Sequence, residues 1–331
     1  MENKQVVFSG IQPTGGFHLG NYIGALVNWK ALQDSYDECL YCVVDLHSLT
    51  VRNDPKILNS NTREAAAMLI ALGIDPDRSI LYVQSHVPAH SQLAWILSCY
   101  TAFGEMSRMT QFKDKAAKNV NNVNVGLFSY PILMAADILL YDTSFVPIGD
   151  DQRQHLEITR DIANRFNGIY GDVFRIPEAI YQKIGARIMS LQDPFSKMSK
   201  SDPNDNSKVM LTDDNDTIVR KFKRAITDSG NEIRIGEGKE GITNLISILS
   251  VVSGKTPKEI EIENEGKMYG EFKLAVADAA IAVVEPIRNR YFEIINDRQY
   301  LESVLDKGKQ AASLKAVKVL KRVTEVIGLV N

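Results

Sequence analysis

The 331-residue sequence has only three cysteines, and none of its segments reaches the roughly 18 uncharged apolar residues that a membrane-spanning helix needs. The first residues, MENKQVVFSG, lack the apolar core of a secretory signal, and low-complexity tracts are missing. These features argue against a disulfide-rich secreted protein and against a membrane partner. We expect a compact protein of the cytoplasm.

Cys39 and Cys42 have the spacing of half a zinc site. However, the run CLYCVVD is typical of a strand, which would send these two side chains to opposite faces, and no second cysteine pair follows. We therefore expect core cysteines and no zinc.

A strong charge of either sign is also missing. The net charge is −3, so the composition as a whole does not indicate nucleic-acid binding. Basic residues gather locally in three groups, each typical of a solvated helix face. The groups are Lys113, Lys115 and Lys118; Arg220, Lys221, Lys223 and Arg224; and Lys315, Lys318, Lys321 and Arg322.

Apolar runs typical of strands alternate with helical patterns in the first half of the chain. The runs are Val6–Ser9, Leu40–Asp45, Ile80–Gln84 and Ser144–Ile148, and the helical patterns include Pro55–Leu72, Pro88–Phe103 and Asp151–Phe166. This alternation predicts an α/β fold with a doubly wound, Rossmann-type parallel sheet. Beyond about Asp213 strand signals almost vanish, which predicts an all-helical C-terminal domain.

A glycine-rich turn, SGIQPTGGFHLGN, leads from the first strand into a helix. The unpaired N–H groups of a helix start bind phosphate, and glycines let the backbone approach it. His18 and Asn21 lie about one helical turn apart, so both can point at one phosphate. The turn predicts a nucleotide site, and the alternative is a tight connection without a ligand.

A polar segment at 192–207 contains KMSKS, residues Lys197–Ser201. Two lysines in a mobile surface loop can follow charge that develops on a triphosphate in the transition state. A lysine pair in such a loop is more often simply solvated, so this motif alone is weak.

Asp137 is the only charged residue of the apolar stretch Tyr130–Tyr141. A buried carboxylate needs a donor, and the commoner donor is an arginine or a helix start elsewhere in the protein. Asp45 and His47, two apart at a predicted strand end, favour hydrogen bonding over a metal pair. We predict no metal site made of protein side chains.

Together these segments resemble the bacterial tryptophanyl-tRNA synthetases, which are class I aminoacyl-tRNA synthetases. The similar segments are FSGIQPTGGFHLGNYIGAL, QSHVPAH, MTQFKDK, YPILMAADILLYD, VPIGDDQRQHLE, GARIMSLQDPFSKMSKSDPN and EGKMYG. They run through most of the chain and are far more specific than either short motif. Two departures are small: His18 stands where many members carry Thr, and Asp150 where Glu is common.

The resemblance implies that the protein activates L-tryptophan with ATP and Mg²⁺, and then transfers it to the 3′ end of tRNA(Trp). The residues expected to act in catalysis are His18, Asn21, Lys113, Lys197 and Lys200. Further residues expected to bind ATP are Gln12, Pro13, Thr14, Gly20, Gly149, Asp150, Asp151, Ile188, Met198, Ser199 and Ser201.

The resemblance also implies a tryptophan pocket in which Asp137 accepts the indole N–H. The other residues expected there are Phe8, His47, Tyr130, Met134, Val146, Ile148 and Gln152. The apolar members would serve equally well as ordinary core, and Gln152 as a surface residue.

By resemblance, residues 1–188 form the catalytic domain, residues 189–295 carry the KMSKS loop and the anticodon-binding helices, and 296–331 form a helix that packs back on the catalytic domain. An insertion at 87–125 would form the interface of a homodimer. Its residues Leu93, Trp95, Ile96 and Phe103 fit an interface and intramolecular packing equally well.

Three alternatives remain open. A tyrosyl-tRNA synthetase shares the fold and both motifs, but its pocket helix differs from MAADILLYD. A catalytically silent relative that binds RNA or a nucleotide would be expected to lose motif residues, whereas Gly20, Lys197 and Lys200 are present. A nucleotidyltransferase shares the first turn but is not expected to keep Lys197–Ser201.

Overall fold

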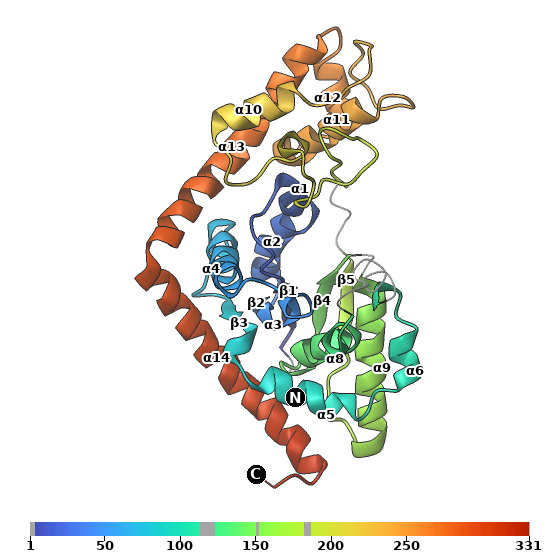
Figure 1. Cartoon of the computed structure of the whole chain (residues 1–331), viewed down its shortest axis with the longest axis vertical. Coiled ribbons are helices and arrows are strands. Elements are labelled where there is room, and N and C mark those ends of the chain that lie inside the picture. Colours follow the sequence, from blue (N-terminus) through green and yellow to red (C-terminus); the bar gives the residue numbers. More distant parts are fainter. Residues whose placement is uncertain (1–3, 113–122, 150–151, 182–186, 331) are drawn as a thin grey trace.

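A five-stranded parallel sheet forms the centre of the lower part of the molecule (Figure 1). The computed structural model describes residues 4–112, 123–149, 152–181 and 187–330. The strands are β1 (Val6–Ile11), β2 (Glu38–Val43), β3 (Ile80–Val83), β4 (Phe145–Ile148) and β5 (Glu178–Tyr181), in the order β3-β2-β1-β4-β5. The predicted doubly wound sheet is confirmed. The strand order reverses between β1 and β4, which is where such sheets bind ligands.

Two details differ from the sequence-based expectation. The edge strand β5 was not expected, because its residues Glu178 and Tyr181 are exposed and it has little apolar pattern. The second strand ends at Val43, and Asp45 begins the short helix α3 (Asp45–Ser48). The prediction that Asp45 and His47 lie on a strand end is therefore wrong.

Helices cover both faces of the sheet and bury one apolar cluster on each. Side chains alternate along β2, so Cys39 joins the cluster under α2 (Val27–Ser35) and α4 (Pro55–Ala71), and Cys42 joins the cluster on the other face. That second cluster includes residues of α5 (Ala89–Ser98), α8 (Val125–Leu139) and α9 (Arg153–Tyr170). Both cysteines are buried and unbridged, as predicted.

The regular secondary structure of the described chain beyond residue 214 is entirely helical. The helices are α10 (Asn215–Lys223), α11 (Glu240–Ser253), α12 (Pro257–Glu263), α13 (Tyr269–Asn296) and α14 (Arg298–Val326). Together α13 and α14 run along one side of the whole molecule (Figure 1). None of the helices among the described residues is long and apolar enough to cross a membrane.

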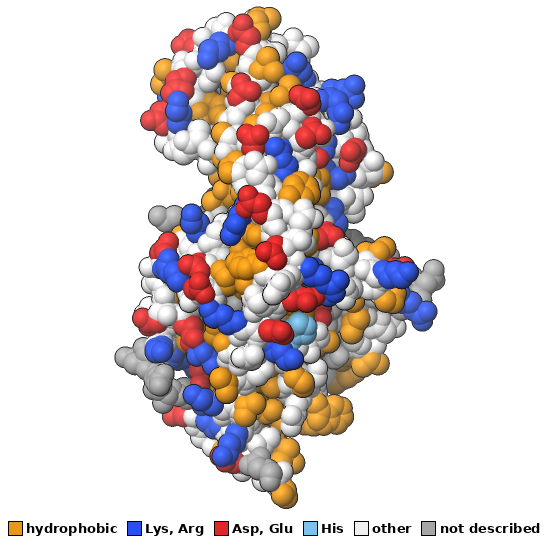
Figure 2. All heavy atoms as spheres, turned by 90° about the vertical axis from the view of Figure 1, so that its left-hand side faces the viewer, with side chains coloured by type: hydrophobic (Ala, Val, Ile, Leu, Met, Phe, Trp, Pro, Cys, Tyr) orange, Lys and Arg blue, Asp and Glu red, His pale blue; other side chains and the backbone are white. Residues whose placement is uncertain are grey.

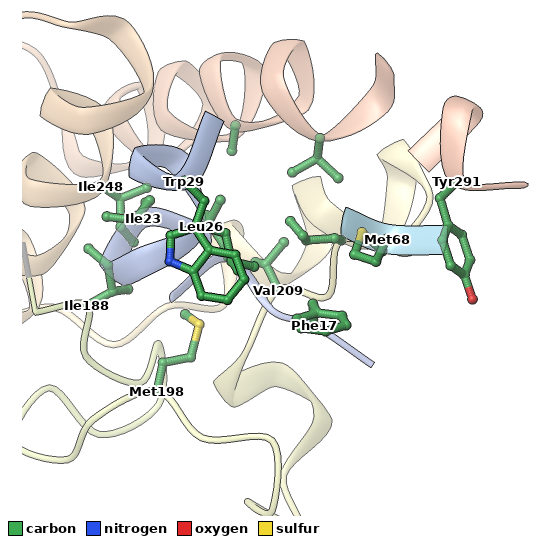
Figure 3. Close-up of a cluster of buried hydrophobic side chains, with 14 of the residues drawn as sticks. Phe17, Ile23, Leu26, Trp29, Met68, Ile188, Met198, Val209, Ile248 and Tyr291 are labelled. Atoms are coloured by element: carbon green, nitrogen blue, oxygen red, sulfur yellow. The ribbon is translucent and has the colours of Figure 1, made fainter. Parts of the chain in front are cut away.

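One apolar cluster joins the helical region to the sheet. It packs Phe17 of the first turn and Met68 of α4 with Met198, with Ile248 of α11 and with Tyr291 of α13 (Figure 3). The boundary predicted between residues 188 and 189 falls inside this shared core. The division of the chain into domains stays a prediction.

The helix α14 lies directly against the edge of β3. A Cβ atom at Gly308 would sit 1.8 Å from the carbonyl oxygen of Leu81, so only glycine allows this approach. Three ion pairs support the contact: Lys307–Asp77 at 2.5 Å, Lys315–Glu38 at 2.6 Å and Arg322–Asp142 at 2.5 Å.

The basic residues of α14 were expected to lie on a solvated helix face. Lys315 and Arg322 instead form ion pairs with Glu38 of β2 and with Asp142. The face formed by α13 and α14 mixes charges of both signs (Figure 2). Its charge distribution therefore does not indicate a binding surface for a strongly charged partner.

Gly308→Ala should destabilise the protein by about 2 kcal/mol or more, because the added methyl group forces α14 away from β3. Chemical denaturation monitored by circular dichroism would measure this loss. Gly168→Ala in α9 is a matched control, since a Cβ there meets no atom within 4 Å. We expect the control to be neutral or stabilising by up to about 1 kcal/mol. Equal stability of the two variants would contradict the close contact.

Candidate active site

The turn after β1 ends in a reciprocal hydrogen-bonded pair. The Nδ1 of His18 accepts from the backbone N–H of Asn21 at 3.2 Å, and the Oδ1 of Asn21 accepts from the backbone N–H of His18 at 3.1 Å. Because Nδ1 is an acceptor, a neutral His18 ring carries its proton on Nε2. The pair therefore leaves two donors, the Nε2–H of His18 and the Nδ2 amide of Asn21, that can face a phosphate.

The helix that follows this turn is irregular. Leu19–Asn21 forms one turn of α-helix, Tyr22–Leu26 is a π-helix, and α2 continues from Val27. π-Helical turns are rare in proteins, and those that occur often lie at functional sites.

The segment 197–211, which begins with the KMSKS motif, packs onto this turn. The backbone N–H of Leu19 donates to Val209 O at 2.8 Å, and that of Leu211 donates to Phe17 O at 2.8 Å. Met198 N donates to Ile188 O at 3.0 Å, and its side chain is buried in the shared core (Figure 3). The prediction of a surface loop is therefore wrong for Met198, because its apolar side chain is anchored in this core.

Lys200 lies beside the glycine turn. A Cβ at Gly15, whose φ is +89°, would be 3.0 Å from Lys200 Nζ and 3.3 Å from Asn61 Oδ1. A side chain at this position would thus be strained and would also crowd the lysine. Burial lowers the pKa of Lys200, and Glu64 opposes this effect.

Three lysines surround a neutral histidine. Burial is the main cause that lowers the pKa of His18 to about 4, and the positive charges of Lys197, Lys200 and Lys208 lower it further. The imidazole is therefore uncharged at neutral pH and acts as a hydrogen-bond donor, while the lysines supply the positive charge. This arrangement suits an anion with several oxygens.

Asp137 lies on α8 and is 1% exposed. Its Oδ1 accepts from Gln84 Nε2 at 2.7 Å and from His90 Nδ1 at 2.6 Å, and its Oδ2 accepts from His47 Nε2 at 2.8 Å. Burial is the largest single influence on this carboxyl and raises its pKa, but the hydrogen bonds and electrostatic interactions of His47 and His90 together outweigh it. The pKa lies well below its usual range, and Asp137 is ionised.

Aromatic side chains lie around the residues that bind this carboxylate. The rings of Tyr130 and His47 meet edge-on, with their centroids 6.2 Å apart, and the hydroxyl of Tyr130 lies 2.7 Å from His155 Nε2. The ring of Phe8 stacks on that of Tyr141, with their centroids 6.1 Å apart. The site therefore combines an ionised acceptor with flat apolar surfaces, which suits a planar apolar group that carries one N–H donor.

Comparison with known proteins identifies the family. Residues 1–285 match the family model described as tRNA synthetases class I (W and Y). The chain belongs to this family.

Similar solved structures cover nearly all of the chain. Tryptophanyl-tRNA synthetase from Mycoplasma pneumoniae is 35% identical, with a TM-score of 0.86 and coverage of 99% of this chain and 98% of that one. The enzyme from Campylobacter jejuni, complexed with ADP and tryptophan, is 34% identical, with a TM-score of 0.85 and coverage of 98% and 100%. Tyrosyl-tRNA synthetase from Aeropyrum pernix, at 20% identity, TM-score 0.68 and coverage of 92% and 89%, shares the fold.

The structure brings the two synthetase motifs together. Gly20 contacts His18, since a Cβ there would lie 3.0 Å from Nδ1. Gly149 accepts from the backbone of Gln152 at 3.0 Å. The predicted pocket residues Phe8, Met134, Val146 and Ile148 all pack in or against the second apolar cluster.

The remaining residues predicted to bind ATP differ in exposure. Gln12 and Thr14 are exposed, Pro13 and Ile188 are buried, and Ser199 and Ser201 hydrogen-bond each other through their hydroxyls at 3.0 Å. Lys113, Asp150 and Asp151 lie outside the described residues. Within the described residues, no group of three or more His, Cys, Asp or Glu could hold a metal ion.

Sequence reasoning missed several residues of the site. Gln84 and His90 donate hydrogen bonds to Asp137, and the charge of Lys208 helps to lower the pKa of His18. The segment QSHVPAH, residues 84–90, belongs to the family resemblance, but its sequence gives no indication that Gln84 and His90 bind the same carboxylate. Lys208 lies just beyond the KMSKS segment, without a pattern of its own.

In the ligand-free protein, we expect the His18 ring to titrate near pH 4 rather than near 6.5. The reason is that protonation would place a positive charge in a buried site beside three lysines. The histidine ring signals in NMR spectra recorded from pH 3.5 to 8, with His18→Asn used for assignment, would measure this midpoint. A His18 signal that titrates between pH 6 and 7 would contradict the described burial.

Proposed function

We propose that this protein is a tryptophan–tRNA ligase that forms tryptophanyl-adenylate and pyrophosphate from L-tryptophan and ATP, and then charges tRNA(Trp). The observation that carries the proposal is the buried, ionised Asp137 carboxylate, which accepts hydrogen bonds from His47, Gln84 and His90. The similarity to tryptophanyl-tRNA synthetases, one of them complexed with ADP and tryptophan, supports it.

Asp137 has the capacity to recognise indole. A carboxylate offers about four acceptor positions, and three are used by Gln84, His90 and His47. The remaining position, on Oδ2, can accept the indole N–H. A phenylalanine ring would leave it unpaired in an apolar pocket, which disfavours phenylalanine beyond the lost contact area.

The remaining predicted pocket residues fit the same substrate. Phe8, Met134, Val146 and Ile148 would contact the two-ring indole. Tyr130 and Gln152 would hold the ammonium group of tryptophan, and His47 would lie between the ring and Asp137.

The first step requires no protein nucleophile. The tryptophan carboxylate attacks the α-phosphorus of ATP, and pyrophosphate leaves with the electrons of the broken P–O bond. The protein must hold the reactants in line and stabilise charge on the phosphates. We assign this stabilisation to Lys197, Lys200 and the donors of His18 and Asn21.

The other ATP contacts stay predictions of the family resemblance. They are Lys113, Asp150 and Asp151, together with Gln12, Pro13, Thr14, Gly20, Gly149, Ile188, Met198, Ser199 and Ser201. Mg²⁺ enters with ATP as part of this substrate.

The second step requires contact with tRNA(Trp), and we assign the anticodon to the helical region around α10. Arg220, Lys223 and Arg224 are exposed there and can support RNA contacts. Lys221 cannot, because it is 1% exposed and forms an ion pair with Asp213 at 2.7 Å.

We further propose that the enzyme is a homodimer of the cytoplasm. Trp95 and Phe103 are 73% and 77% exposed, which suits an interface. Leu93 and Ile96 are buried within the chain and serve its own packing.

Exchange of labelled pyrophosphate into ATP, measured with each of the twenty amino acids, Mg²⁺ and no tRNA, tests the proposed function. We expect exchange with tryptophan alone. Exchange with tyrosine instead would keep the fold and family and overturn the role of Asp137. A protein that supports no exchange would be a catalytically silent relative. Charging of tRNA(Trp) in the presence of tryptophan then tests the second step.

Lys200→Ala should slow tryptophan activation about a hundredfold and change the KM for tryptophan by less than about threefold, because the lysine acts on charge that develops in the transition state. Single-turnover adenylate formation would measure the rate. Lys223→Ala, an exposed lysine of α10, is the control and should leave tRNA-free activation unchanged. A large rise in the KM for tryptophan at an unchanged rate would refute the assignment.

A further inference from the structure

His90 is completely buried on α5 and connects Asp137 to two tyrosines. Its Nδ1 lies 2.6 Å from Asp137 Oδ1, and its Nε2 lies 2.8 Å from the Tyr141 hydroxyl and 3.2 Å from the Tyr82 hydroxyl. The three rings lie close together, with centroid separations of 5.6 to 5.8 Å. The proposed activity uses none of these three side chains directly.

These contacts determine where His90 carries its proton. An ionised carboxylate can only accept, so the hydrogen bond to Asp137 requires a proton on Nδ1. On the other side of the ring, Nε2 lies within hydrogen-bond distance of both tyrosine hydroxyls. Burial, the main influence on both, raises the pKa of Tyr82 and of Tyr141 well above the usual range, so both hydroxyls keep their protons and can donate.

The donors are divided between the two oxygens of Asp137. Oδ1 receives both Gln84 and His90, whereas Oδ2 receives His47, whose ring contacts Tyr130. The side of the carboxylate that faces α5 is thus filled. Oδ2, which His47 binds, keeps an acceptor position.

We propose that His90 is a positioning residue for amino-acid specificity: held by Tyr82 and Tyr141, it binds Asp137 Oδ1 and so turns Oδ2 toward the indole N–H. This inference rests on the proposed function. It assigns the selection of indole to a residue that does not touch the substrate.

Two isosteric variants separate positioning from simple packing. In His90→Asn, the side-chain amide can occupy the place of Nδ1, which keeps the donor to Asp137 and loses the contacts with the tyrosines. In His90→Gln, the amide reaches the place of Nε2, which keeps the tyrosine contacts and loses the donor to Asp137. If His90 served only for packing, His90→Gln would not impair amino-acid selection more than His90→Asn.

The measurement is kcat/KM in pyrophosphate exchange for tryptophan and for 3-benzothienylalanine, which has sulfur in place of the indole N–H. We expect His90→Gln to reduce the ratio of the two values about tenfold or more, toward that of Asp137→Asn. His90→Asn should keep the ratio within about threefold of wild type. The KM for ATP should not change in either variant.

Two outcomes would overturn the inference. One is an unchanged ratio in His90→Gln, whether activity is kept or is lost equally for both substrates, which would mean that His90 only packs. The other concerns the wild-type enzyme. If the wild-type enzyme itself fails to prefer tryptophan over the analogue, the proposed indole contact of Asp137 fails first, and the role of His90 fails with it. Wild-type preference therefore distinguishes the two failures.

A measurement on the wild-type protein does not depend on whether the variants fold. The ¹⁵N chemical shifts of the His90 ring report which nitrogen is protonated, and we expect the proton on Nδ1. A proton on Nε2 alone would refute the hydrogen bond to Asp137 and the proposal with it.

Discussion

The buried charge of Asp137 is the constraint on which the rest of the site depends. Leaving a carboxylate without donors inside an apolar cluster costs several kcal/mol, about 3–5 when one partner of a buried pair is removed. The fold meets this demand with donors from three places: His47 in α3, Gln84 after β3 and His90 in α5. These segments must therefore meet at α8, and the shape of the pocket follows from their meeting.

A second constraint is electrostatic and acts at the other end of the site. Lysines that gather to hold an anion repel one another and any further cation when the anion is absent. The protein keeps His18 neutral among them, so the ring adds a donor without adding charge. The apolar contacts of Met198 hold the lysine segment in place, so its position does not depend on the charges alone.

The sequence predicted the elements with strong patterns and missed contacts between distant ones. The four apolar runs led directly to the parallel sheet, whereas β5 has only four residues with two exposed ends and no clear pattern. Asp137 was found because one charge among apolar residues is conspicuous. His90 and Gln84 were not, since the need for a donor is visible in a sequence while the identity of the donor depends on how distant segments pack. The place of Lys200 beside Gly15 likewise required the two segments to be seen together.

The contact between Gly308 and Leu81 has a consequence for how the sheet ends. Among the described strands β3 pairs only with β2, so its outer edge would present unpaired backbone groups, a template on which strands from other molecules can assemble. The backbone of α14 lies close enough to shield this edge, and the ion pairs of its basic side chains hold it there. Besides completing the fold, α14 therefore covers an edge on which strands of other molecules could otherwise pair.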